Sequence, residues 1–116
     1  MKALMNRLAV IGFVLTLLYG ASASAGEEVA TVITKGYKFI PQEITVKVGT
    51  TVRWVNKEKR QYHSVYFNDL KDQEDSDYFF PDESRERTFN KPGTYHYYCE
   101  PHRDAEKMVG VVHVVE

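Results

Sequence analysis

The sequence has few of the residues that disulfide-bonded, nucleotide-binding or nucleic-acid-binding proteins need. Only one of its 116 residues is cysteine, which excludes a scaffold of intrachain disulfides. Its seven glycines form no glycine-rich loop, so a dinucleotide-binding or P-loop enzyme is not expected. Fifteen lysines and arginines stand against 16 aspartates and glutamates, which excludes a strongly basic nucleic-acid-binding protein. A chain of this length holds one small core and no second domain.

Long hydrophobic runs are also missing. The apolar stretch from Leu8 to Tyr19 is too short to cross a bilayer comfortably. Two basic residues precede this stretch, and small residues follow it up to Ala25, as in a secretory signal peptide. The sequence therefore predicts a signal peptide over residues 1–25 and one mature domain over residues 26–116, whose net charge is −3 instead of −1 because cleavage removes two basic residues. An uncleaved N-terminal anchor is the alternative.

The mature chain is predicted to be all-β. Short stretches rich in valine, isoleucine and threonine are separated by turn residues, and no convincing helical period is present. Seven to eight short strands in one small domain indicate a β-sandwich. The strands are expected at Glu28–Thr34, Glu43–Val48, Thr51–Asn56, Val65–Phe67, Arg85–Asn90, Thr94–Cys99 and Val109–Val115.

The single cysteine has a histidine and a methionine nearby. Exported proteins usually carry cysteines in pairs, so Cys99 alone leaves open a buried thiol, an intermolecular disulfide or a metal ligand. His102 and Met108 lie within ten residues of Cys99. A thiolate, an imidazole and a thioether suit copper that cycles between its two oxidation states, and this set favours the metal site.

A trigonal copper site with a long axial thioether needs a second imidazole. If Cys99 points inward on a strand, His96 points outward, because side chains alternate between the faces. His113 lies in an alternating run of valines, where a solvated or packed histidine is expected. His63 stands at the start of an apolar stretch and is the histidine best placed at the rim of a sheet.

One segment, Asn68 to Glu86, breaks the strand pattern. It holds eight acidic and two basic residues, a net charge of −6. A solvated loop is one interpretation, and a docking patch for a basic partner is the other. Tyr78, Phe79 and Phe80 are expected to anchor this segment to the sandwich.

Three stretches of the sequence resemble the cupredoxins, the small blue copper proteins, and within them the plastocyanin, pseudoazurin and amicyanin group. Gly36–Pro41 with Ile44–Val46 is similar to the opening strands of these proteins. Val52–Asn56 with His63–Val65 is similar to the segment that carries their first histidine, and Pro92–His102 to the strand and loop that carry the other ligands. The resemblance implies a cupredoxin-like Greek-key β-sandwich with one type 1 copper per chain. It also implies that the copper ligands are His63, Cys99, His102 and Met108.

The loop between the last two of these ligands departs from the family pattern. Five residues separate His102 from Met108, where two or four are usual, and Glu106 competes for the axial position. A carboxylate there would be a harder ligand and would lower the reduction potential. Met108 is favoured because it directly precedes the strand that begins at Val109.

The signal peptide predicts export to the periplasm. The resemblance further implies a soluble protein that acts as a one-electron carrier, is not an enzyme and is a monomer. Its expected partners are redox proteins such as a c-type cytochrome or a dehydrogenase or reductase, with no nucleic acid and no stable membrane insertion after signal cleavage. Copper sequestration or delivery is the alternative function. An open copper site with Glu106 as ligand would instead indicate an enzyme.

Electrons are expected to pass through the exposed edge of His102, inside an apolar patch to which Pro101 and Pro41 contribute. Tyr98, beside Cys99, is a second route for electrons, and the acidic segment could steer a basic cytochrome toward it. Asn56 is a candidate for tying the Cys99 loop to the His63 loop, or it only ends a strand. Basic residues at 57, 59 and 60 leave the charge of the partner open.

Overall fold

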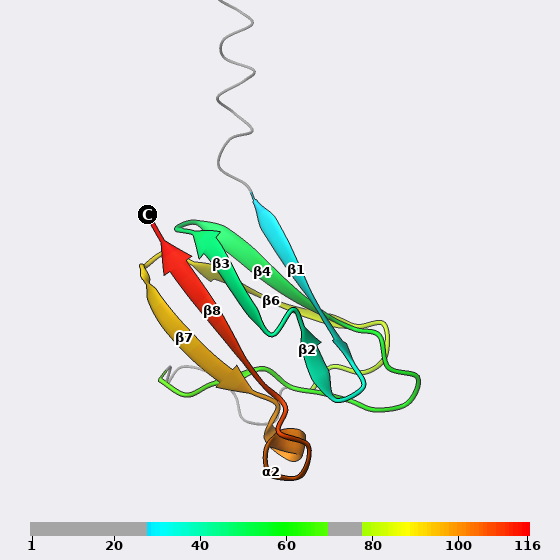
Figure 1. Cartoon of the computed structure of the whole chain (residues 1–116). Coiled ribbons are helices and arrows are strands. Elements are labelled where there is room, and N and C mark those ends of the chain that lie inside the picture. The colour runs from blue at the N-terminus through cyan, green and yellow to red at the C-terminus, as the bar shows by residue number, and fades with distance from the viewer. Residues whose placement is uncertain (1–27, 70–77) are drawn as a thin grey trace, which may run out of the picture.

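A computed structural model of the chain describes residues 28–69 and 78–116 (Figure 1). The predicted signal peptide and residues 70–77 of the acidic segment lie outside the described residues. The described residues form eight strands, a 3-10 turn and one short helix. These elements are β1 (Val29–Lys35), β2 (Lys38–Ile40), β3 (Glu43–Lys47), β4 (Thr50–Asn56), β5 (Tyr66–Phe67), β6 (Ser84–Phe89), β7 (Gly93–Tyr98), η1 (Glu100–His102), α2 (Arg103–Glu106) and β8 (Val109–Val115).

The strands make two four-stranded sheets that pack face to face. One sheet has the order β2-β1-β4-β6 and the other the order β3-β8-β7-β5. The pairs β1–β4 and β3–β8 are parallel, and the remaining pairs are antiparallel. Strands that are distant in the sequence become neighbours in both sheets, because the chain crosses between them. The predicted all-β sandwich is confirmed, with eight strands.

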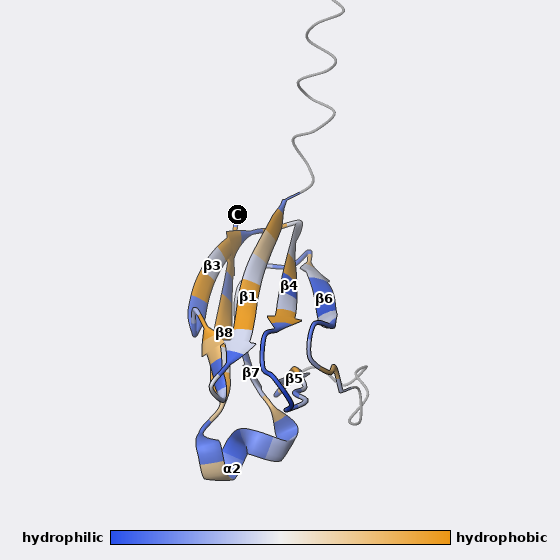
Figure 2. Cartoon of the chain, turned by 90° about the vertical axis from the view of Figure 1, so that its right-hand side faces the viewer, coloured by the Kyte–Doolittle hydropathy of each residue, from blue (hydrophilic) through white to orange (hydrophobic). Residues whose placement is uncertain are grey.

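The core lies between the sheets and follows from the alternation of side chains. Val52 and Trp54 are both buried on β4, as the period of two predicts. Tyr97 near the end of β7 and Cys99 just after it are buried, whereas His96, which precedes Tyr97, is exposed. Apolar residues recur along the strands, and the hydrophilic α2 caps one end of the sandwich (Figure 2). Cys99 and Met108 both belong to the buried core at this end.

An aromatic cluster fills the middle of this core. The ring of Tyr97 lies 4.7 Å from Phe39, 5.4 Å from Trp54 and 5.3 Å from Phe67, measured between centroids. Gly110 on β8 pairs with Tyr97 across the sheet, and a Cβ atom at Gly110 would lie only 2.3 Å from Cζ of Tyr97. The absence of a side chain at position 110 therefore makes room for the Tyr97 ring, two residues before Cys99.

The strand spacing did not predict three short elements. The strand β2 has only three residues, and η1 and α2 follow Cys99 with three and four residues. A segment of three or four residues is too short to show a period of two or of 3.6 residues. Within residues 28–69 and 78–116, no helix has the length and apolar character needed to cross a membrane.

Candidate metal centre

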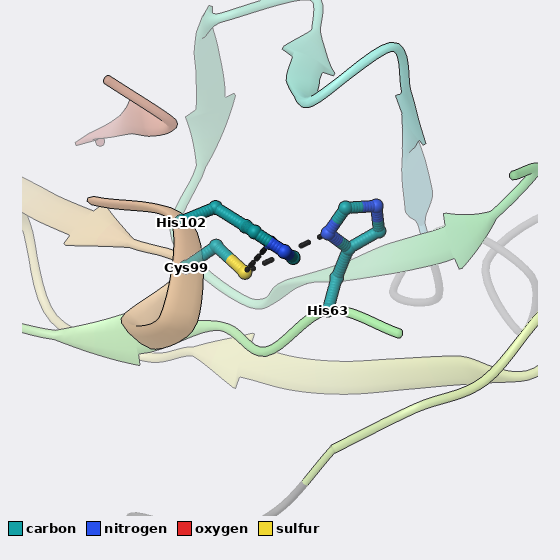
Figure 3. Close-up of side chains that lie close together, drawn as sticks. All are labelled: His63, Cys99 and His102. Atoms are coloured by element: carbon teal, nitrogen blue, oxygen red, sulfur yellow. Dashed lines mark hydrogen bonds between the residues drawn. The ribbon is translucent and has the colours of Figure 1, made fainter. Parts of the chain in front are cut away.

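Three side chains that can bind a metal converge at the α2 end of the sandwich. Ligand atoms of His63, Cys99 and His102 all lie within 4.8 Å of one another, and no other group of this kind occurs in the described part of the chain. Sγ of Cys99 is 3.6 Å from Nδ1 of His63 and 3.3 Å from Nδ1 of His102. Figure 3 shows the sulfur pointing toward both imidazole nitrogens.

The two remaining histidines lie away from this cluster. His96 is exposed on the outer face of β7. His113 on β8 places Nε2 3.0 Å from Oε1 of Glu43, on a sheet surface. The structure thus brings together the histidines that the sequence singled out and leaves out the two that the strand pattern excluded.

The loop after β7 returns Met108 to the cluster despite its extra length. The amide of Cys99 donates to the carbonyl of Met108 at 3.0 Å, and the amide of Met108 donates to the carbonyl of His102 at 3.2 Å. The short helix α2 takes up the additional residues, and Lys107 turns the chain with a φ of 57°. Met108 is 1% exposed in the same core as Cys99, whereas Glu106 is exposed.

The position of His63 is fixed by its backbone. His63 and Phe79 exchange two amide-to-carbonyl hydrogen bonds, at 3.1 and 2.9 Å. Phe79 is fully buried and anchors the segment that begins at Tyr78. Of the other two aromatic residues predicted to act as anchors, Tyr78 is half-buried, and Phe80 is 51% exposed but packs its ring on Tyr62 at 5.5 Å.

The orientation of the His63 ring is set by Glu58. Oε2 of Glu58 lies 3.0 Å from Nε2 of His63 and also accepts a hydrogen bond from the amide of Tyr37 at 3.1 Å. A carboxylate only accepts hydrogen bonds, so Nε2 carries the proton and the lone pair of Nδ1 faces Cys99. The sequence carries no signal for this role of Glu58, because the contact depends on how the loop between β4 and His63 folds back on the ring.

Ser64 ties the two ligand loops together. Its amide donates to Sγ of Cys99 at 3.3 Å, and its hydroxyl accepts from the amide of Glu100 at 2.9 Å. The prediction that Asn56 makes this link is wrong. Nδ2 of Asn56 donates instead to the carbonyls of Gln61 and Phe79, so Asn56 stabilises the His63 side alone.

Burial sets the protonation of the cluster. Desolvation lowers the pKa of His63 below its usual value, although Glu58 acts in the opposite direction. Desolvation also lowers the pKa of His102, so both imidazoles are neutral at pH 7 and can offer a lone pair. Burial raises the pKa of the Cys99 thiol, against the hydrogen bonds from Ser64. Binding as thiolate therefore requires a metal that drives the deprotonation.

Two aromatic rings surround the exposed edge of His102. The ring of Tyr37 lies 4.8 Å from the His102 ring, edge to face, and the ring of Tyr62 lies 6.4 Å away. Tyr62 in turn packs on Tyr78 at 4.7 Å. Pro41 and Pro101, the residues expected near this edge, are both exposed.

The donor set fits copper. One thiol and two imidazoles converge without a carboxylate among them, with Cys99 and His63 buried and His102 half-buried, and a buried thioether lies in the same core as Cys99. Hard cations such as Mg²⁺ and Ca²⁺ prefer oxygen ligands, whereas sulfur and imidazole suit copper.

Comparison with known proteins identifies the family. The sequence model of the copper-binding proteins of the plastocyanin/azurin family matches residues 26–115. The chain belongs to this family. Copper is accordingly the metal of its site, and the resemblance to the cupredoxins is confirmed.

This family member is similar to plastocyanin and amicyanin. It is 39% identical over 111 residues to the chloroplastic plastocyanin of Physcomitrium patens, covering 85% of this chain and 63% of the relative. It is 34% identical over 85 residues to the amicyanin of Paracoccus versutus, covering 71% and 64%. The chain thus spans slightly less than two thirds of the length of these two relatives.

Solved structures of the same fold include an amicyanin and a copper-containing nitrite reductase. The amicyanin of Paracoccus versutus superposes with a TM-score of 0.65 at 32% identity, over 74% of this chain and 80% of that one. A copper-containing nitrite reductase from Thermus scotoductus superposes with a TM-score of 0.61 at 30% identity, over 75% of this chain and 22% of the enzyme. The fold of this family member therefore also occurs as part of a larger copper enzyme.

Proposed function

We propose that this protein is a one-electron carrier with a single type 1 copper. Nδ1 of His63, Nδ1 of His102 and Sγ of Cys99 would hold the metal, and Met108 would supply the axial thioether. The observation that carries the proposal is the buried thiol of Cys99 between two imidazole nitrogens, at 3.6 and 3.3 Å. Copper bound there would cycle between Cu(II) and Cu(I) and so supply one-electron transfer.

The surrounding residues would keep this site rigid and dry. His63 and Cys99 are both 0% exposed, so they have no contact with bulk water. Backbone hydrogen bonds from Met108 and Phe79 fix the two ligand loops. A site whose ligands stay in place needs little rearrangement when its charge changes, which favours fast electron transfer. The half-buried ring of His102 leads from this site to the surface.

A first prediction concerns the carboxylate beside His63. Replacing Glu58 with Gln should raise the reduction potential, because a negative charge that stabilises Cu(II) is removed, and should weaken copper binding roughly tenfold. Potentiometric titration and competition with a chelator measure both effects. Glu43→Gln is the matched control, since Glu43 contacts His113 in the same way at 3.0 Å, away from the cluster. Equal potentials in the two variants would show that Glu58 does not act on the site.

A second prediction concerns the axial ligand. Replacing Met108 with Gln should shift the visible spectrum of the copper protein and lower its potential, because an oxygen donor stabilises Cu(II). Glu106→Gln should leave the spectrum unchanged, since Glu106 is exposed. Spectra and potentials of the two single variants decide the assignment. If only the Glu106 variant changes, the axial ligand is Glu106.

Two other functions make different predictions. A delivery protein would gain from several exposed methionines, whereas residues 26–116 hold one, which is 1% exposed. The fold also occurs in a nitrite reductase, which makes an enzyme the other candidate. An enzyme needs an open position on the metal. A carrier should give a reversible one-electron voltammetric wave, and azide should leave its visible band unchanged. Azide binding to the oxidised protein would favour an enzyme instead.

The cellular location is part of the proposal. Residues 1–25 would act as an export signal and residues 26–116 as a soluble, monomeric periplasmic domain that serves a c-type cytochrome, a dehydrogenase or a reductase. The intact mass of protein recovered from the periplasm should then correspond to a chain that begins at Gly26. A mass that includes Met1 would support an uncleaved anchor.

A further inference from the structure

A groove with a basic rim lies beside the metal centre. It has a volume of about 500 Å³ and runs between the β1–β2 turn and the loop that follows β4. Four exposed cations line it, together with Gly36, Tyr37, Glu58 and Gln61; these cations are Lys35, Lys57, Lys59 and Arg60. No ion pair joins any of the four to an acidic residue within residues 28–69 and 78–116. Their charge is therefore available to a partner.

The one acidic residue of the groove is already engaged. Both hydrogen bonds of Glu58 point inward, to Nε2 of His63 and to the amide of Tyr37, and its side chain is 13% exposed. The groove therefore carries four positive charges and one negative charge, a net charge of +3. The neighbouring loop of η1, α2 and Lys107 carries three acidic and two basic residues apart from His102, a net charge of −1. The positive potential at this end is concentrated on the groove side.

Two residues of the groove touch the proposed copper ligands. Glu58 contacts the ring of His63 at 3.0 Å. Tyr37 sits in the turn with a φ of 58° and packs its ring edge on His102 at a centroid distance of 4.8 Å. Only Glu58 would then separate a molecule in the groove from His63, and only Tyr37 would separate it from His102.

From this charge and placement we infer that the redox partner docks on the basic groove through an acidic surface of its own. The inference rests on the proposed carrier function and specifies the partner. Complementary charge raises the encounter rate and orients the pair, and both effects weaken as salt screens them. The acidic segment 68–86 as docking site for a basic cytochrome is the opposing hypothesis, and it predicts the opposite preference.

Two forms of one cytochrome test the inference. Mitochondrial cytochrome c is basic, and its fully succinylated form is acidic because its lysine amines become carboxylates. The reduced copper protein is mixed with each ferric cytochrome in a stopped-flow instrument, where one electron leaves the copper protein and reduces the haem. Lys57→Gln/Lys59→Gln is compared with the control Lys47→Gln/Lys91→Gln, which removes the same charge from two exposed lysines, one at the end of β3 and one in the turn between β6 and β7. The end of β3 and this turn lie at the end of the sandwich away from α2 (Figure 1).

The acidic cytochrome should react faster than the basic one, and its rate should fall as salt rises. The groove variant should lower that rate roughly tenfold and the control variant should leave it nearly unchanged. Equal rates in the two variants, or a preference for the basic cytochrome, would overturn the inference.

Amide shift mapping separates the inference from the carrier function. Succinylated cytochrome c is added to the ¹⁵N-labelled protein, and no electron transfer is needed. Shifts centred on residues 35–37 and 57–61 support docking even if neither cytochrome is reduced, an outcome that would count against the carrier function alone. Shifts centred elsewhere overturn the docking site even if both cytochromes are reduced.

Discussion

Copper added to the Cys99→Ser variant is expected to give no intense visible band and no electron transfer. A serine hydroxyl stays protonated where a thiol loses its proton to the metal, so the thiolate-to-copper transition disappears. Sulfur and oxygen differ little in size, and the amide of Ser64, now 3.3 Å from Sγ, can still donate to the hydroxyl. The metal-free variant should therefore keep its circular dichroism spectrum.

The matched control for this change is His113→Gln. His113 lies on the outer surface of β8, bonded to Glu43, and its loss should leave the visible band intact. A variant without Cys99 that kept the band would contradict the assignment outright, because the chain has no other cysteine.

The largest expected loss of stability follows from Gly110→Ala. The added Cβ would lie 2.3 Å from Cζ and 2.4 Å from the hydroxyl oxygen of Tyr97. Tyr97 is 1% exposed and wedged between Phe39 and Trp54, so its ring cannot move aside without disturbing the core. Overpacking of this kind lowers the free energy of unfolding by roughly 2–3 kcal/mol. Urea unfolding of the metal-free protein measures the change.

Gly36→Ala provides the comparison for this prediction. Gly36 has a φ of 62° and no atom within 4 Å of an added Cβ, so only backbone strain opposes the substitution. Its cost should be about 1 kcal/mol. A Gly110 variant no less stable than the Gly36 variant would show that the Tyr97 ring relaxes freely. Because Tyr97 and Gly110 flank Cys99 and Met108 at a distance of two residues, the visible band of the Gly110 variant should shift as well.

The sequence was sufficient to predict the features that depend on local spacing. If Cys99 points inward, alternation along β7 places His96 outside, because the two faces of a strand follow from a period of two. Both positions are confirmed, since Cys99 is buried and His96 is exposed. His113 was set aside because it lies in an alternating run of valines, and His63 was favoured by its place at the start of an apolar stretch. The structure brings Nδ1 of His63 within 3.6 Å of Sγ of Cys99. The family resemblance supplied the sandwich topology, which the spacing of strands alone does not determine.

The contacts that orient the ligands could not be predicted in this way. Glu58 and Ser64 act through the way two loops fold against each other, and neither contact leaves a periodic pattern in the sequence. For the same reason the sequence left the role of Asn56 open between a link of the two loops and the end of a strand, and did not predict its bonds to Gln61 and Phe79. Tyr37 reaches His102 only because a tight turn places it there in a left-handed conformation. Side-chain contacts between segments far apart in the chain require the tertiary structure.

The visible and electron paramagnetic resonance spectra of the Cu(II)-loaded protein test the central claim most directly. A site made by His63, Cys99 and His102 with a distant thioether predicts an intense thiolate-to-copper band and narrow copper hyperfine splitting. A weak band with the splitting of ordinary tetragonal copper would contradict a type 1 site, and with it the proposal that this protein carries electrons.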